Sequence, residues 1–184
     1  MQGAWETDRL LLRELGPEHA AAVRSLGLRC MEYHVPWEPV RPSDHWEMPV
    51  VSQRLQTQLA ESRADKSLCL CLSLKSDPEG LVGSVNLRNI MRGALHSAHL
   101  GYGLAPEAVG NGYMTEAVLA VVHIAFSSLN LHRIEANIIP RNTRSLGVAQ
   151  RAGFSHEGFS PRYLRVNGRW EDHVRLARLN ESMQ

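Results

Sequence analysis

The chain has 184 residues, 43% hydrophobic and 21% charged, a composition typical of a globular domain that excludes intrinsic disorder for most of its length. It carries 20 Lys and Arg against 19 Asp and Glu, and this near balance excludes a generally basic surface for nucleic acid or an anionic membrane. Its apolar stretches are too short to span a membrane, no export signal is evident, and three cysteines fit neither a disulfide framework nor a zinc site.

The first third of the chain predicts one strand and two helices around an irregular segment. Residues 9–14 predict a short strand, and a helix runs from Gly16-Pro17-Glu18 to about Leu28. Residues 31–49 hold four of the nine prolines and two of the four tryptophans, so we expect this segment to be irregular and functional. A second helix is predicted over residues 50–64.

Three strands and a long helix are expected next. Residues 67–74 alternate leucine with serine and cysteine, and a turn at 76–80 leads to a strand over 81–87. Residues 96–104 predict a third strand. The helix over 111–129 is apolar on nearly all sides, which predicts burial on more than one face.

The last third completes an α/β (α+β) domain. Residues 133–139 predict a strand, and Asn142 is placed to cap a helix that ends at Gly153. Strands over 159–166 and 170–179 flank Asn167-Gly168, a strong hairpin signal. We therefore expect a mixed, mainly antiparallel sheet of about seven strands, flanked by four helices.

No repeat or flexible linker divides the sequence, so a single domain is expected over residues 1–184, with its core at about 8–180. A reducing cytoplasmic setting is the default for such a chain, with no membrane, no direct nucleic-acid partner and no metal.

Gly110-x-Gly112 before the long helix is the first candidate site. Backbone N–H groups at such a helix start can bind phosphate oxygens, although two glycines there are more often only a tight turn. A Rossmann loop would need a third glycine, and a Walker loop a Gly-Lys-Ser/Thr. Asn142 and Ser145, in the first turn of a later helix, can likewise face a ligand or serve as an ordinary cap.

Together these segments resemble one family. The sequence contains LGYGLAPEAVGNGYMTEAV at 100–118 and LHRIEANIIPRNTRSLGVAQRAGF at 131–154, which resemble the GNAT superfamily of acetyl-CoA-dependent N-acetyltransferases. PWEPVR at 36–41 and YLRVNGRWEDHV at 163–174 narrow the similarity to ribosomal-protein alanine N-acetyltransferases of the RimJ branch. The resemblance extends over nearly the whole chain.

The resemblance implies a GNAT fold with acetyl-CoA in a cleft between two strands. The superfamily often has Gln or Arg where this chain has Glu107, so we expect Glu107 to point to solvent and backbone amides to carry the phosphates. The implied acetyl-CoA-binding residues are Tyr102, Leu104, Val109, Gly110, Asn111, Gly112, Tyr113, Met114, Thr115 and Asn142.

By the same resemblance, a neutral amine attacks the thioester directly. Glu157 is the first candidate for the base, although a carboxylate at a strand edge paired with an arginine is an equal interpretation. Ser145 is the expected donor to the leaving thiolate. His99 ranks third, because a histidine in an alternating strand is more often structural. The cysteines do not favour a covalent acetyl-enzyme.

Residues 31–47 are interpreted as a lid. The segment contains four acidic residues and only one arginine. The expected substrate-binding residues are Tyr33, Trp37, Glu38 and Trp46. A negative field suits a cationic amine. The alternative is a surface loop whose tryptophans cap the core.

Three functions stay open. The first is acetylation of a protein N-terminus, with an alanine-starting ribosomal protein as the expected acceptor. The others are acetylation of a small amine such as an aminoglycoside or polyamine, and non-catalytic acyl-CoA binding, as in a ribosome-assembly factor. A monomer and a homodimer are equally compatible with the sequence.

Overall fold

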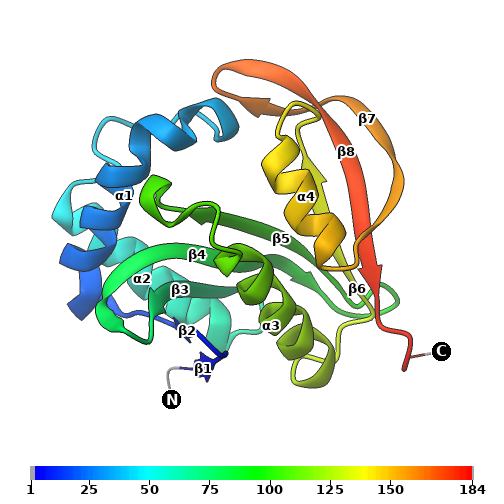
Figure 1. The fold of residues 1–184 in the computed structure, drawn as a ribbon, viewed down its shortest axis with the longest axis horizontal. Helices are drawn as coiled ribbons and strands as arrows, with labels where there is room; N and C mark the ends of the chain where they lie inside the picture. The colour runs from blue at the N-terminus through cyan, green and yellow to red at the C-terminus, as the bar shows by residue number, and fades with distance from the viewer. Residues whose placement is uncertain (1–2, 184) are drawn as a thin grey trace.

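An eight-stranded sheet forms the centre of the protein, whose computed structural model describes residues 3–183 (Figure 1). The strand order is β1-β2-β3-β4-β5-β6-β8-β7, and every neighbouring pair is antiparallel except β5 and β6. The strands are β1 (Ala4–Glu6), β2 (Leu10–Arg13), β3 (Leu68–Leu74), β4 (Asp77–Met91), β5 (Ser97–Leu104), β6 (Arg133–Ile138), β7 (Ser155–Val166) and β8 (Arg169–Leu179). The expected mixed, mainly antiparallel α/β architecture is confirmed.

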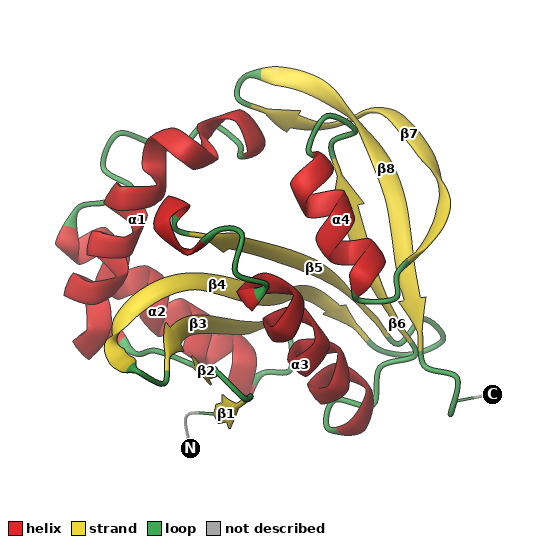
Figure 2. Cartoon of the chain, viewed as in Figure 1, coloured by secondary structure: helices red, strands yellow, loops and turns green. Residues whose placement is uncertain are grey.

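Helices cover both faces of the sheet (Figure 2). They are α1 (Ala20–His34), α2 (Met48–Arg63), α3 (Tyr113–Ser127) and α4 (Thr143–Arg151). Alternation along β3 separates two cores: Leu70 and Leu72 pack with α3, whereas Cys71 packs with the buried residues of α1 and α2. The two cysteines of β3 thus lie on the face opposite to the main core, and burial raises the pKa of Cys71 to about 12.

The irregular segment is shorter than its sequence predicts at both ends. α1 continues to His34, since neither glycine nor proline interrupts it after Gly27, and a short 3-10 helix, η2 (Val35–Trp37), follows at Pro36. α2 begins at Met48 because Pro49 is tolerated in the first turn of a helix. The prediction that residues 31–49 are irregular throughout is therefore wrong.

Two strands start earlier than predicted. β4 includes most of the predicted 76–80 turn, with Pro78 near its first residue, where a missing N–H is tolerated. β7 starts at Ser155 instead of 159, and register shifts at His156/Gly158 and Ser160/Leu164 interrupt the alternation that reveals a strand. The three-residue β1, paired along β2, gives too short a pattern to be predicted and brings the number of strands to eight.

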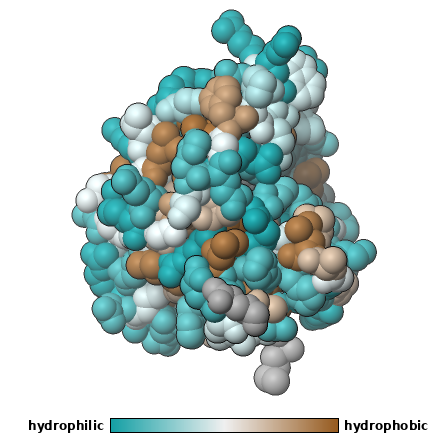
Figure 3. Space-filling view, turned by 90° about the vertical axis from the view of Figure 1, so that its right-hand side faces the viewer, coloured by the Kyte–Doolittle hydropathy of each residue, from teal (hydrophilic) through white to brown (hydrophobic). Residues whose placement is uncertain are grey.

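β7 and β8 form a long hairpin at one edge of the sheet. Their outer surface exposes Phe159, Leu164 and Trp170. The side of the molecule shown in Figure 3 is mostly hydrophilic, and its hydrophobic spots are separated from each other.

α3 begins at Tyr113 because Gly110 and Gly112 both have positive φ, +92° and +78°, which no helix accepts. Its buried side runs from Met114 to Ala125, while Leu119 is 43% exposed. The expected burial on more than one face is thus only partly right: one broad face is buried and the other meets solvent.

The parallel pair β5 and β6 separates along its length. The two strands pair only from Ser97↔Arg133 to His99↔Glu135. Beyond that point β5 continues to Leu104 along β4, and β6 continues to Ile138 along β8. The facing backbone edges of β5 and β6 are therefore free of each other at the centre of the sheet.

Candidate active site

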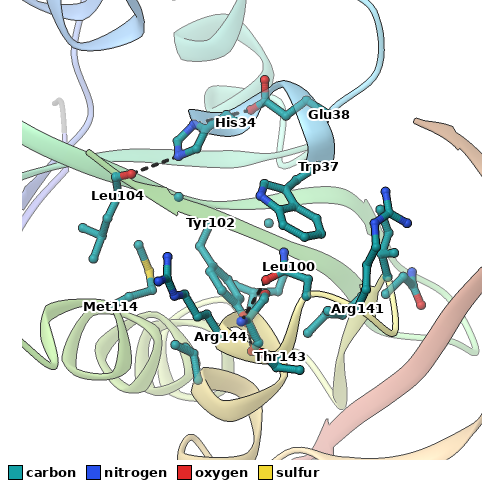
Figure 4. A pocket seen from close by; sticks show the side chains of 18 of the residues that line it. His34, Trp37, Glu38, Leu100, Tyr102, Leu104, Met114, Arg141, Thr143 and Arg144 are labelled. Atoms are coloured by element: carbon teal, nitrogen blue, oxygen red, sulfur yellow. Dashed lines mark hydrogen bonds and ion pairs between the residues drawn. The ribbon is translucent and has the colours of Figure 1, made fainter. Parts of the chain in front are cut away.

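A cavity of about 470 Å³ opens where β5 and β6 separate. One side is formed by α1 and η2, and the other by the starts of α3 and α4. Figure 4 shows His34, Trp37 and Glu38 on the first side and Met114, Thr143 and Arg144 on the second. The predicted site residues that line it are Tyr33, Trp37, Glu38, Tyr102, Leu104, Val109, Met114, Asn142 and Ser145.

The glycine-rich loop lies between β5 and α3, at one end of this cavity. The Nδ2 of Asn111 donates to the carbonyls of Ala108 (3.3 Å) and Val109 (3.4 Å), closing the loop. A Cβ built on Gly110 would meet nothing within 4 Å, so the loop presents open space on that side. The first-turn amides of α3 have no intrahelical acceptor, as an anion site of this kind needs.

Two arginines reach this loop, and the sequence pattern predicts neither. Arg9 Nη1 donates to the Asn111 carbonyl (2.9 Å), while its guanidinium pairs with Glu116 (2.7 Å) and lies 4.7 Å from the Tyr113 ring centroid. Arg151, in the last turn of α4, donates from Nε to the hydroxyl of Thr115 (3.2 Å). Both lie far from the loop in sequence.

Glu107 points away from the loop. Its carboxylate pairs with Arg29 at 3.1 Å and is 57% exposed, which agrees with the expected orientation toward solvent.

Tyr102, Asn142 and Ser145 form one hydrogen-bonded group at the cavity wall. Asn142 Oδ1 accepts from the Ser145 backbone N–H (3.1 Å), so Asn142 is the helix cap of α4 as well as a cavity residue. The Tyr102 hydroxyl donates to the Ser145 carbonyl (2.8 Å), and the Ser145 hydroxyl donates to Tyr102 (3.0 Å). Burial raises the pKa of Tyr102, although Ser145 and Arg151 act in the opposite direction. The phenol is therefore protonated at neutral pH.

Glu157 and His99 are not among the residues that line the cavity. Glu157 is 41% exposed and pairs with Arg133 at 2.5 Å, which also contacts Glu135 at 3.1 Å. His99 Nε2 lies 3.8 Å from Glu135. The arginine-paired carboxylate is thus the arrangement found for Glu157. Sequence spacing could not reveal it, because Arg133 lies 24 residues earlier and meets β7 only across the sheet.

The lid residues divide into two groups. Tyr33, Trp37 and Glu38 line the cavity, whereas Trp46 does not. A Cβ on Gly27 would lie 2.0 Å from the Trp46 ring, so this indole packs directly on α1. The substrate-binding assignment of Trp46 is therefore corrected: it caps the core between α1 and α2, where a glycine leaves room for it.

Hydrogen bonds and a cation–π contact join the lid to residues on the opposite side of the cavity. The Arg141 guanidinium lies 5.4 Å from the Trp37 ring centroid and pairs with Glu171 at 2.7 Å. Arg144 Nη1 donates to the Tyr33 hydroxyl (2.6 Å). At the hairpin turn, the Asn167 N–H donates to the Glu38 carbonyl (2.8 Å). These contacts roof the cavity.

Of the four acidic lid residues, Glu38 alone is among the described residues that line the cavity, so the acidic side chains do not gather there as expected. Glu38 is paired with Arg41 at 2.6 Å, and the other charged residues that line the cavity are Arg141 and Arg144. His34 donates from Nε2 to the Leu104 carbonyl (2.9 Å), so that carbonyl already has a partner. The lid supplies aromatic and hydrogen-bonding surface instead of negative charge.

A parallel strand pair that separates around a cavity, with a glycine-rich helix start at one end, defines the class of acyl-CoA-dependent acyltransferases with the GNAT fold. The chain belongs to the acetyltransferase (GNAT) domain family, which matches residues 9–155. It is an acetyl-CoA-dependent N-acetyltransferase.

Individual relatives and solved structures are similar to this chain over most of its length. A probable N-acetyltransferase of Bacillus subtilis, YjcK, is 38% identical over 161 residues, covering 86% of this chain and 88% of the relative. The ribosomal-protein-S5-alanine acetyltransferase of Vibrio fischeri is 30% identical, with a TM-score of 0.93 over 99% of each chain. Mycobacterium smegmatis RimJ, solved in complex with CoA-disulfide, is 31% identical, with a TM-score of 0.88 over 99% of this chain and 88% of that one. The similarity to the RimJ branch is confirmed.

Residues 3–183 contain neither a membrane-spanning helix nor a cluster of metal ligands. Helices long and apolar enough to cross a bilayer are not found in this range. Three or more His, Cys, Asp or Glu side chains positioned to hold a metal ion are not found there either.

Proposed function

We propose that this enzyme transfers the acetyl group of acetyl-CoA to the N-terminal α-amino group of a protein, and that an alanine-starting ribosomal protein is the acceptor. The observation that carries this proposal is the roofed cavity, which has a glycine-rich helix start at one end and an aromatic lid on the other side. The high similarity to the S5-alanine acetyltransferase of Vibrio fischeri over nearly the whole chain supports the acceptor class.

The residues present fit acetyl-CoA. The loop at 109–112 and the first turn of α3 offer backbone amides to the diphosphate, and Gly110 leaves the approach open. β5 has no partner strand on its β6 side after His99, so the backbone of residues 101–103 is available to the amides of pantetheine. Bound there, acetyl-CoA supplies an electrophilic thioester carbonyl and a thiolate leaving group.

We propose that Tyr102 protonates the departing sulfur. Tyr102 lines the cavity, and burial raises the pKa of its phenol, which is protonated at neutral pH. In the resting enzyme this proton is donated to the Ser145 carbonyl (2.8 Å), so the hydroxyl has to turn to the sulfur as the C–S bond breaks, and the phenolate then regains a proton from water. The Ser145 hydroxyl, the donor expected from the sequence, donates to Tyr102 and orients it. Ser145 then acts through Tyr102.

The attacking amine needs little help to lose its proton. An α-amino group has a pKa of about 7.7–8.0, so a useful fraction of the acceptor amine is neutral at pH 7. Glu157 and His99 stand outside the cavity, and water can accept the proton. We therefore do not require a side-chain base for this step.

The acceptor class is tested by thiol release from acetyl-CoA. The panel contains peptides that start with Ala, Ser or Met, together with spermidine and an aminoglycoside. We expect release with the Ala peptide and N-terminal acetylation of it by mass spectrometry. Release with the free amines but with no peptide would overturn the protein-acceptor proposal, and CoA binding without release for any acceptor would point to a non-catalytic role.

A further inference from the structure

Arg151 is a cation at the glycine-rich loop that no carboxylate neutralises. Its Nε donates to Thr115 Oγ1 in the first turn of α3 (3.2 Å). Among residues 3–183, no Asp or Glu oxygen lies within the 4.0 Å of a salt bridge to its guanidinium. Arg9, the other arginine at this loop, is instead paired with Glu116 at 2.7 Å. One uncompensated positive charge therefore stands at the helix start.

The side chain of Arg151 is directed to this place by its own helix. Gly147 lies one turn before it, and a Cβ there would come within 3.1 Å of Arg151 Nη1. The absent side chain leaves a path along α4 toward α3. Ser145 and Val148, which precede Arg151 on the same stripe of α4, both line the cavity. This row of residues on α4 thus extends from Ser145, beside which we place the sulfur of CoA, to the glycine-rich loop.

The chemistry of this position is that of an anion site. First-turn amides and the α3 dipole favour negative charge at this end, and a guanidinium adds hydrogen bonds that phosphate oxygens accept in pairs. Glu107, three residues before the first glycine of the loop, is an acid and is paired with Arg29. The loop sequence itself therefore brings no cation to the phosphates.

We propose that Arg151 binds the diphosphate of CoA and supplies the charge that the loop lacks. This inference rests on the proposed position of CoA. It changes the expectation from the sequence, in which backbone amides alone carry the phosphates. Thr115 holds the free guanidinium in place, and the phosphates gain a charged partner from α4, a different element from the loop.

The test measures binding of three ligands by calorimetry to wild type and to Arg151→Gln. The ligands are CoA, dephospho-CoA, which lacks the 3′-phosphate, and pantetheine, which lacks every phosphate. We expect Arg151→Gln to weaken CoA and dephospho-CoA equally, by about tenfold, and to leave pantetheine unchanged. The salt dependence of the CoA Kd should also become shallower.

Two variants separate the charge from the local structure. Arg151→Lys retains the cation and should recover part of the CoA affinity. Thr115→Val removes the hydroxyl contact but keeps the charge, and should weaken CoA by less than about threefold. Arg169→Gln, an exposed arginine at the hairpin turn, should have no effect.

Several results would overturn the inference. Loss of affinity for CoA but not for dephospho-CoA would place Arg151 at the 3′-phosphate instead. Equal losses in Thr115→Val and Arg151→Gln would indicate a structural role for their hydrogen bond, as would a matching loss of pantetheine affinity. If wild type itself failed to bind CoA, the proposed function would fail before Arg151 was tested.

Discussion

Tyr102 and Ser145 hold each other by two hydrogen bonds across the junction of β5 and α4. The phenol donates to the serine carbonyl at 2.8 Å, and the serine hydroxyl donates to the phenol oxygen at 3.0 Å. This pair ties the strand that separates from β6 to the helix that covers the cavity. In the resting enzyme the Tyr102 proton therefore points to the Ser145 carbonyl.

Tyr102→Phe should lower kcat by about 10- to 100-fold and leave the CoA Kd nearly unchanged, because it removes only a proton donor. Ser145→Ala should have a smaller effect, and the double variant should be no worse than Tyr102→Phe, since Ser145 acts through Tyr102. Steady-state kinetics with the Ala peptide measures this. Tyr163→Phe, on the hairpin, is the control. Full activity of Tyr102→Phe would remove the phenol from the mechanism.

Gly112→Val should weaken CoA binding by at least about tenfold. Gly112 has φ +78° at the N-cap of α3, and a β-branched residue with positive φ is strained by about 1–3 kcal/mol. Gly93→Val is a matched control, because Gly93 has φ +69° and open space around it but lies in the turn after β4. Both variants should lose stability by thermal unfolding, and only Gly112→Val should lose CoA affinity. Equal CoA affinity in the two would contradict the loop assignment.

Glu157→Gln should lower kcat by less than about threefold, because the carboxylate is exposed and paired with Arg133 outside the cavity. The pH dependence of kcat/KM should stay that of the acceptor amine. Initial rates between pH 6 and 9 measure both quantities. A fall of about 100-fold with an unchanged CoA Kd would instead support the role that the sequence resemblance implies for Glu157.

His45 should make the protein less stable in acid. Burial, together with the cations Arg41 and Arg54, lowers its pKa from 6.5 to about 4. The neutral ring is held by Arg41 (2.7 Å) and Arg54 (3.0 Å) at Nε2. A histidine whose pKa is lower in the folded state contributes stability above pH 6.5, and that contribution is lost as the pH falls from 6.5 toward 4. Glu38 and Asp44 oppose this shift only in part.

Chemical denaturation at pH 7 and at pH 4.5 tests this effect. His45→Gln should lose less free energy of unfolding between the two pH values than wild type does. His123→Gln, at an exposed position of α3, should behave as wild type. An unchanged pH dependence in His45→Gln would show that other groups cause the acid sensitivity.

The order of the elements and the position of the glycine-rich loop could be predicted because both depend on local features. Alternation along 67–74 and 96–104 marks strands, and Gly112 takes the positive φ that ends the loop and starts α3. Where the local pattern is interrupted, prediction failed: register shifts hide the start of β7, and a proline accepted in its first turn hides the start of α2.

The contacts that the site residues make could not be predicted from any local sequence pattern. Trp37 and Trp46 are the same residue type in one segment, yet one faces the cavity and the other packs on Gly27. Glu157 on β7 meets Arg133 on β6 across β8, the strand that lies between them in the sheet.

The sequence by itself therefore determined the fold class, the family and the position of the glycine-rich loop, since backbone conformation and side-chain periodicity are encoded over a few residues. The tertiary structure alone decided which charges meet at the site. Arg151 reaches Thr115 across 36 residues, because the packing of α4 beside α3 brings together groups that no spacing in the chain connects.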